Sequence, residues 1–165
     1  MSTDAITILR ADHKEVRSLF REFEKSTTTS ARRGKIVEKV IELLTVHTYI
    51  ENEVMYPEVR RLLPDLEDDI LESYEEHHVA DVLVMELATM KPSDERFRAK
   101  TTVLIENVRH HMDEEENDWF PKVRQGLGRK VLGELGEQLL QAKETAPRSP
   151  AQPSALKKVV DAVVS

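Results

Sequence analysis

The chain has 165 residues, which corresponds to one domain at roughly 150 residues per domain. Charged residues make up 33% and hydrophobic residues 39%, with only 5 Gly and 7 Pro, a composition that favours a helical globular protein over a collagen or a disordered chain. The 24 Lys and Arg against 31 Asp and Glu give a net charge of −7, so we expect no nucleic-acid partner. With no cysteine, disulfides, iron–sulfur clusters and thiolate zinc sites are excluded, and any metal must be bound by His, carboxylate or water.

Neither a signal peptide nor a membrane span is expected. The first residues, MSTDAITILRADH, lack a basic segment followed by an apolar one. No stretch approaches the ~20 apolar residues that cross a bilayer. We therefore place the protein in the cytoplasm, away from membranes.

Helical spacing of apolar residues runs through the first 125 residues. Apolar side chains recur every three or four positions, the pattern of an α-helix with one buried face. The pattern breaks at 26–30, at Pro64 and Asp65, and at 91–94, where Ser93 is a candidate N-cap for the next helix. The predicted helices cover residues 6–25, 36–63, 66–90 and 97–125. Four helices joined by short loops predict an all-α, up-down-up-down antiparallel four-helix bundle.

Residues 126–165 are predicted to be a C-terminal extension with a different character. A weaker helix follows Gly128 and contains Gly133 and Gly136, each costing about 1 kcal/mol relative to Ala, so tertiary contacts must hold it. Residues 145–154 are Pro-rich and indicate an extended linker. The last segment, 155–165, has one apolar side and is too short for a stable isolated helix. It either packs on its own bundle or docks on a protein partner.

An internal repeat carries the histidines. Sliding the sequence against itself by 64 residues aligns two H-x-x-x-E motifs, each followed by an aromatic residue and proline. We therefore predict two copies of a helical hairpin, residues 1–61 and 65–125. The aligned pairs are His13 with His77, His47 with His111, Glu51 with Glu115, and Pro57 with Pro121.

These polar residues are expected at one level of the bundle. Residues on neighbouring antiparallel helices lie level when they are equally far from the connecting turn. The midpoint of His13 and His47 is residue 30, and that of His77 and His111 is residue 94, both beside predicted breaks. The midpoint of Glu51 and His77 is residue 64, at the central break.

A layer of imidazoles and carboxylates in an apolar core indicates a metal centre. A buried carboxylate that is ionised and unpaired costs several kcal/mol. His and Glu at i and i+4 project from one helix face, so each motif can bind one cation or extend a carboxylate across two. The donors suffice for a dinuclear centre bridged by Glu51 and Glu115, and nitrogen with oxygen donors suits Fe, Mn or Zn. The alternative is a structural network of protonated histidines and carboxylates.

The pattern H…HxxxE…H…HxxxE, with an aromatic-Pro pair after each HxxxE, resembles the hemerythrin-like (HHE cation-binding) proteins over about residues 5–125. The resemblance implies a non-haem centre of two Fe ions, with an oxo or hydroxo bridge, in a four-helix bundle; Mn or Zn is less favoured. It also implies dioxygen, hydrogen peroxide or nitric oxide as partners. The ligands that it implies are His13, His47, Glu51, His77, His111 and Glu115.

One position departs from the family pattern. Oxygen-carrying hemerythrins have a second histidine on the third helix, in H-x-x-x-H, whereas this chain has Asp81 four residues after His77 and Ser73 four residues before it. Simple reversible oxygen carriage is therefore in doubt. Asp81, Tyr74 or His78 is a possible additional ligand, or the position is open to solvent.

Several neighbouring residues are predicted to have ordinary structural roles. His78 and His110 adjoin candidate ligands but are expected at the surface or the boundary of the bundle. Tyr56, Trp119 and Phe120 are expected to pack near helix ends. Asp12 and Glu76 precede candidate ligands and could orient imidazoles, although solvated charge is the preferred interpretation. The acidic run of Asp113, Glu114 and Glu116 is interpreted as a solvated face.

Two functions remain open. The first is redox chemistry: binding of dioxygen, or reaction with hydrogen peroxide (catalase-like) or nitric oxide, so that enzymatic activity is uncertain from sequence. The second is iron or oxygen sensing, or iron binding, with the extension after Gly128 signalling to a protein partner.

Overall fold

The first helix, α1 (Ala5–Lys25), starts where the side chain of Asp4 caps it, because Asp4 Oδ1 accepts the Thr7 N–H at 2.8 Å. In this computed structural model, which describes residues 3–25 and 30–150, helices follow one another along the described chain without a strand. The prediction of an all-helical protein is confirmed. The remaining elements are α2 (Ser30–Ile50), η1 (Glu51–Met55), α3 (Tyr56–Leu62), η2 (Pro64–Leu66), α4 (Glu67–Ala88), α5 (Phe97–Glu114), η3 (Glu115–Trp119) and α6 (Phe120–Thr145).

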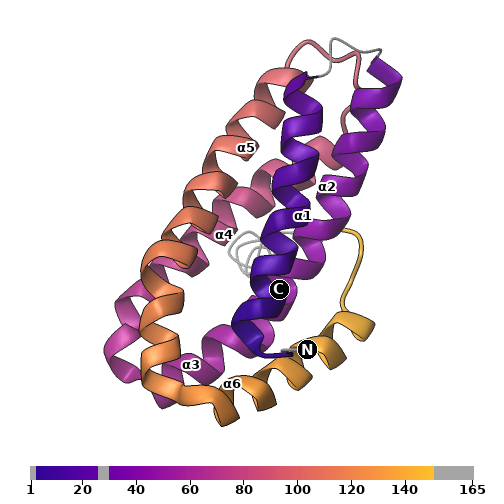
Figure 1. Cartoon of the computed structure of the whole chain (residues 1–165). Coiled ribbons are helices and arrows are strands. Elements are labelled where there is room, and N and C mark those ends of the chain that lie inside the picture. Colours follow the sequence, from indigo (N-terminus) through magenta and orange to yellow (C-terminus); the bar gives the residue numbers. More distant parts are fainter. Residues whose placement is uncertain (1–2, 26–29, 151–165) are drawn as a thin grey trace, which may run out of the picture.

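The long helices pack side by side, with α1 against α2 and α4 against α5, and α2 against α4. In Figure 1 the chain passes along the long axis of the molecule, turns at one end, and returns, and the α4–α5 connection lies at the same end as the end of α1. Within the described residues, no helix is both long enough and apolar enough to cross a membrane.

Two single π-helical turns interrupt the helices that the sequence predicted to be continuous. The first, η1, begins at Glu51, and the second, η3, begins at Glu115, so they lie 64 residues apart like the motifs themselves. Each turn is closed by an i+5 bond, in which the N–H of Tyr56 donates to the Glu51 carbonyl and that of Phe120 to the Glu115 carbonyl. Such turns insert one extra residue and are frequent at functional sites.

The prediction that Ser93 is the N-cap of the fourth helix is wrong. Ser93 does not cap it; α5 begins at Phe97, because Asp94 forms a turn of its own. Asp94 Oδ2 accepts the Lys91 N–H at 2.8 Å, and its carbonyl accepts the Phe97 N–H at 3.1 Å. The helix therefore starts only after this turn is complete.

The apolar core consists of two clusters with the polar layer between them. On α1, Val16 and Phe20 belong to the first apolar cluster and Ile6 and Leu9 to the second, and His13 lies between the two sets. The repeat thus places its polar residues in the middle of a core that is apolar above and below.

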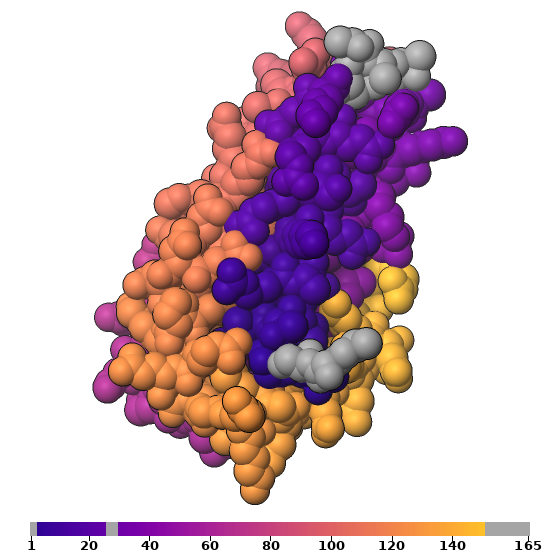
Figure 2. Space-filling model, in the orientation of Figure 1, coloured from indigo at the N-terminus to yellow at the C-terminus, as the bar shows by residue number. Residues whose placement is uncertain are grey.

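The end of the bundle is covered by α6 (Figures 1 and 2). Gly128, with φ of 75°, kinks the helix, and the part after the kink buries Leu132, Leu135 and Leu139 in the second apolar cluster. Gly136 approaches the N-terminal segment so closely that a Cβ there would lie 1.7 Å from the Thr3 carbonyl oxygen. These are the tertiary contacts that the glycine-containing helix needs. The predicted terminal segment 155–165 lies outside the described residues.

Candidate metal centre

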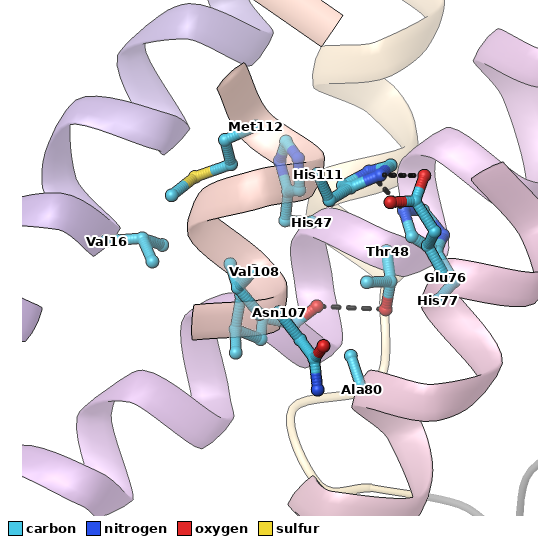
Figure 3. A pocket seen from close by; sticks show the side chains of 11 residues that line it. Val16, His47, Thr48, Glu76, His77, Ala80, Asn107, Val108, His111 and Met112 are labelled. Carbon is cyan, nitrogen blue, oxygen red and sulfur yellow. Dashed lines mark hydrogen bonds and ion pairs between the residues drawn. The ribbon is translucent and has the colours of Figure 1, made fainter. Parts of the chain in front are cut away.

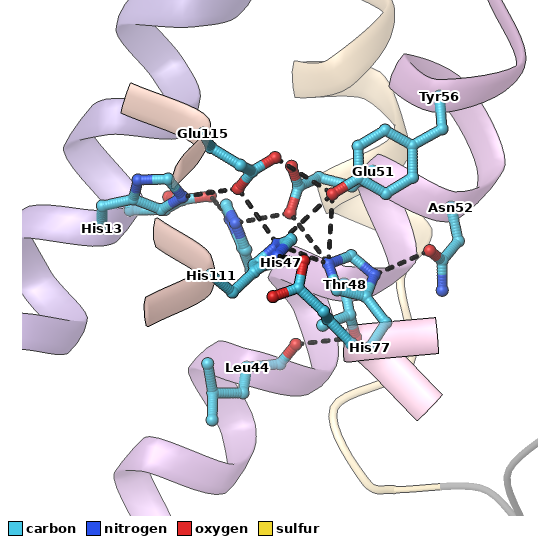
Figure 4. Close-up of polar contacts among 12 residues, drawn as sticks. His13, Leu44, His47, Thr48, Glu51, Asn52, Tyr56, His77, His111 and Glu115 are labelled. Carbon is cyan, nitrogen blue, oxygen red and sulfur yellow. Dashed lines mark hydrogen bonds and ion pairs between the residues drawn. The ribbon is translucent and has the colours of Figure 1, made fainter. Parts of the chain in front are cut away.

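Six buried side chains from different helices meet between the two apolar clusters (Figure 4). Each is at most 6% exposed. They are His13 on α1, His47 on α2, Glu51 at the start of η1, His77 on α4, His111 on α5 and Glu115 at the start of η3. The structure therefore brings together all six residues that the sequence singled out.

The six side chains form two groups of three donors. His13, His47 and Glu115 make one group, and Glu51, His77 and His111 make the other. Within each group, the donor atoms lie within 4.8 Å of one another, which is close enough to hold a metal ion.

Each glutamate connects the two groups. Glu115 Oε1 lies 3.3 Å from His13 Nε2 and 3.2 Å from His111 Nε2. Glu51 Oε1 lies 2.7 Å from His47 Nε2 and 3.5 Å from His77 Nε2. Each of these two carboxylates thus lies between histidines of both groups.

Two of the imidazoles are oriented from behind by carboxylates of the preceding helix. Asp12 Oδ2 lies 2.9 Å from His47 Nδ1, and Glu76 Oε1 lies 3.1 Å from His111 Nδ1. Our preferred interpretation of these acids as solvated charge is therefore wrong. Partners of this kind fix the ring and raise the basicity of the nitrogen that faces a metal.

The other two imidazoles have partners as well, and these also follow the 64-residue repeat. Asn52 Oδ1 lies 2.8 Å from His77 Nδ1, and Glu116 Oε1 lies 3.5 Å from His13 Nδ1. Glu116 in turn contacts Arg17 Nη2 at 2.7 Å, so its interpretation as part of a solvated face is also wrong. All four rings present Nε2 to the centre and Nδ1 to an outer residue.

The buried carboxylates and imidazoles of the layer shift one another's pKa toward the charged forms. Burial alone lowers the pKa of His47, but Glu51 and Asp12 outweigh it and raise that pKa to about 10. His111 shows the same balance, and Glu115 and Glu76 raise its pKa well above the usual value. Burial raises the pKa of Glu51 and Glu115, yet the neighbouring histidines lower both. Without a metal, the carboxylates thus lie next to the protonated imidazoles of His47 and His111.

The donor atoms nevertheless remain poorly satisfied by one another. Among the described residues, both ring nitrogens of His13, His47 Nε2, both carboxylate oxygens of Glu51 and Glu115 Oε1 are buried and make no hydrogen bond of good geometry, although most of them lie in ion-pair contact with a neighbouring donor. A purely structural network would be expected to pair such atoms in good geometry. Nitrogen and oxygen donors that converge in two groups within one buried layer fit bound cations better.

Tyr56 is the site residue that our sequence interpretation missed. Its buried hydroxyl donates to Glu115 Oε2 at 3.0 Å and lies 3.3 Å from His77 Nε2 and 3.4 Å from His111 Nε2. Burial raises its pKa well above 10, and Glu115 and Glu51 add to this, so the group stays a hydroxyl. The π-helical turn η1 places Tyr56 in the layer. The available signal was the aromatic residue five positions after each motif glutamate.

The three candidates for an additional ligand lie outside the two groups of donors. Asp81 and His78 are half-buried and belong to neither group. Burial raises the pKa of Asp81, against the effect of His77 and His78. The Tyr74 hydroxyl faces the Asn52 carbonyl at 3.5 Å, and its ring meets that of Tyr56 edge-on at 5.3 Å. Tyr56 is thus the additional group nearest the donors.

A small cavity adjoins the centre on the side of the first apolar cluster (Figure 3). Its volume of about 20 Å³ leaves space for one water-sized molecule. Its lining combines five apolar residues with six polar ones, among them His47, His77 and His111.

The sequence resembles that of known proteins. The profile of the hemerythrin HHE cation binding domain matches residues 4–123. A curated relative, the "DNA nickase" of Nostoc sp. (strain PCC 7120), is 31% identical over 123 residues, which cover 73% of this chain and 33% of the relative. This chain thus spans about a third of that relative's length.

A solved structure shows the same fold. The crystal structure of a hemerythrin HHE cation binding domain-containing protein from Mycobacterium kansasii gives a TM-score of 0.73 at 22% identity, with 86% of each chain covered. The family profile, in turn, matches well over half of this chain and includes all six converging donors. The protein belongs to the hemerythrin HHE cation-binding family.

Proposed function

We propose that this protein is a non-haem di-iron protein that binds dioxygen or reacts with hydrogen peroxide or nitric oxide. In this proposal an up-down-up-down bundle of two hairpins, 1–61 and 65–125, holds the ions, and 126–165 is an extension. The observation that carries the proposal is the convergence of buried imidazole and carboxylate donors, several of which make no hydrogen bond of good geometry within the described residues. The proposed ligands are His13, His47, Glu51, His77, His111 and Glu115.

The donor set favours iron. Imidazole and carboxylate donors without sulfur suit Fe, Mn or Zn and disfavour Mg or Ca. Two iron ions would supply electrons and Lewis acidity for chemistry with a small oxidant. In hemerythrin-like proteins this is the expected metal, so Fe is preferred over Mn and Zn.

The protein's own residues restrict what can react. Only a molecule of a few atoms fits the cavity of about 20 Å³ beside the donors. The hydroxyl of Tyr56 can donate a hydrogen bond to a small anionic ligand in the layer, since it already donates to Glu115 Oε2. The layer therefore suits diatomic molecules and peroxide.

The name of the Nostoc relative does not extend this proposal to DNA. That chain is about three times longer than the matched region. The net charge of −7 does not favour binding of a polyanion.

Metal analysis with optical spectroscopy tests the proposal. Protein purified from iron-replete cells should contain about two Fe per chain and show oxo-to-iron charge-transfer absorption that changes when dioxygen or peroxide is admitted. Peroxide consumption faster than that of free iron would establish catalase-like activity. Less than one metal ion per chain after saturation with Fe²⁺ would refute the proposal.

A second function, iron or oxygen sensing through the extension, is favoured by one contact. The Nζ of Lys143 on α6 donates to Asp12 Oδ1, and Asp12 Oδ2 faces His47 Nδ1. The extension is thus two contacts away from a proposed ligand. Hydrogen exchange of residues 129–145 should slow when metal binds if sensing uses this path. Equal exchange in metal-free and loaded protein would remove the mechanism.

A further inference from the structure

The second hairpin has an additional group of donors at its surface. Glu76, His110 and Glu114 each offer a ligand atom, and these atoms lie within 4.8 Å of one another. His110 Nε2 lies 3.1 Å from Glu114 Oε1. His110 and Glu114 repeat the H-x-x-x-E spacing one residue before His111 and Glu115, so they project to the outside of the same helix.

This outer group adjoins a pocket that reaches the buried centre. The pocket contains both exposed acids and the buried residues His111 and Glu115. Glu115 is 2% exposed, and its Oε1, which lies 3.3 Å from His13 Nε2 and 3.2 Å from His111 Nε2, makes no hydrogen bond of good geometry within the described residues. The other residues that line it are Asp69, Glu72, Ser73, Glu76, Glu114, Asp118 and Trp119.

The charge of this pocket is strongly negative. Six of its lining residues are acids. Lys122 Nζ lies 3.2 Å from Asp69 Oδ2 and 3.1 Å from Asp118 Oδ2, and His111 lies against Glu76 and Glu115. Glu76 connects the outer group with the centre, because its Oε1 also faces His111 Nδ1 at 3.1 Å. A cation is attracted to such a pocket and concentrated in it.

The first hairpin, over the residues that the structure describes, has no equivalent of this group. The positions 64 residues before His110 and Glu114 are Val46 and Ile50, which are buried and apolar. Asp12, the counterpart of Glu76, is instead paired with Lys143. The repeat alone therefore does not explain the outer donors.

We propose that Glu76, His110 and Glu114 form an outer site at which divalent iron binds before it moves through the acidic pocket to the buried ligands. This inference rests on the proposed di-iron function. Mixed carboxylate and imidazole donors suit Fe²⁺, and exposure of His110 and Glu114 leaves the ion partly hydrated, so that binding is weak and release inward is easy. No electron transfer is needed, because the ion only exchanges water for protein ligands.

Anaerobic iron loading of metal-free full-length protein tests the inference. The variant His110→Ala with Glu114→Gln leaves the six proposed ligands intact, as well as Glu76, which orients His111. Uptake of micromolar Fe²⁺ is monitored as the loss of iron from a colorimetric chelator. We expect the rate of this uptake to fall about fivefold or more in the double variant. The final iron content should remain that of the wild type. The matched control is Glu137→Gln, which removes one exposed carboxylate on α6, away from the pocket.

The possible outcomes separate this inference from the proposed function. An unchanged uptake rate, or slowing that Glu137→Gln reproduces, would overturn the outer site while leaving the di-iron centre standing. A lower final iron content in the double variant would also overturn it, because these residues would then belong to the resident site. Failure of the wild type to take up iron would refute both. As an independent measurement, Mn²⁺ added to iron-loaded protein should broaden the His110 ring resonances first, and broadening elsewhere only would contradict the site.

Discussion

The two hairpins supply the same inner residues but differ in what surrounds them. In both, the proposed ligands and the partners behind each imidazole recur after 64 residues. Around the first hairpin, Asp12 is paired with Lys143 of α6, which covers that part of the layer. Around the second, Glu76 faces surface donors and an acidic pocket. The difference teaches that a repeat can build a centre symmetrically while one half becomes closed and the other accessible.

The residues after the π-helical turns differ as well. Tyr56 follows η1 and directs its hydroxyl at Glu115. Its counterpart after η3 is Phe120, whose ring stacks on His13 with centroids 5.7 Å apart. One half thus adds a proton donor to the layer, and the other adds an apolar wall.

Replacing Glu51 or Glu115 should have the largest effect, on the iron content of the protein. Comparing the two variants should show whether the two hairpins contribute equally to the centre. Because each glutamate contacts a histidine of both groups, Glu51→Gln and Glu115→Gln should each reduce the iron content from two ions to about one or none. Iron per chain is measured by elemental analysis. Glu53→Gln, which replaces an exposed carboxylate two residues away, should keep two ions. Wild-type iron content in both ligand variants would contradict the bridging role.

The packing of α6 over the first hairpin can be disrupted by a substitution at Gly136. A methyl group there would collide with the Thr3 carbonyl, so Gly136→Ala should lower the free energy of unfolding by about 2 kcal/mol and loosen α6. At Gly133 an added Cβ would meet no described atom within 4 Å, so Gly133→Ala should instead stabilise the protein by about 1 kcal/mol. Denaturant unfolding of both variants checks the difference. Effects of the same sign would show that α6 does not seal this end as described.

The ligand layer could be predicted from sequence because its spacing follows the helix period and is repeated. His13 and His47 lie on apolar faces, and the turn midpoints placed them level with the second set. Tyr56 could not be predicted in this way. In a regular α-helix it would lie about 140° around the axis from Glu51, on a different face, and only the extra residue of the π-helical turn brings it back.

The outer partners were missed for a related reason. A helical face is assigned one helix at a time, and by that measure Asp12 points about 100° away from His13. Its contact is with His47 on the neighbouring helix, and this depends on how α1 and α2 pack together. The same holds for Glu76 and His111. The closing contact of Lys143 required, in addition, the kink at Gly128 that turns α6 across the end of the bundle.

The difference between Tyr56 and Phe120 can be tested by exchange. Tyr56→Phe removes the donor to Glu115 Oε2 and should destabilise the metal-free protein by about 1 kcal/mol. In the iron-loaded protein it should also shift the charge-transfer bands, because a hydrogen bond at the centre is lost. Phe120→Tyr is the matched control, since it adds a hydroxyl in the half that lacks one. An absorption spectrum identical to that of the wild type in Tyr56→Phe would show that the hydroxyl does not act on the centre.

The smallest expected effect is a change in the number of protons released when metal binds. It allows Asp12, which contacts His47, to be compared with Glu76, which contacts His111. In metal-free protein, Glu51 and Asp12 raise the pKa of His47 to about 10. Protonated His47 therefore stabilises the fold fully below its unfolded pKa of about 6.5, and this stabilisation is lost as the pH rises through about 10. A metal ion requires the neutral ring, so it must displace this proton, and affinity should increase with pH across that window.

Calorimetry of Zn²⁺ binding at pH 7, in buffers with different ionisation enthalpies, counts the displaced protons. Asp12→Asn should lower the pKa of His47 and reduce the count by a fraction of one proton, and Glu76→Gln should do the same through His111, whose pKa Glu115 and Glu76 raise. Because Lys143 already neutralises part of Asp12, we expect the reduction to be smaller for Asp12→Asn. Equal reductions would mean that the contact of Lys143 with Asp12 has no electrostatic effect on the centre. The two hairpins would then differ only in how accessible their side of the layer is to solvent.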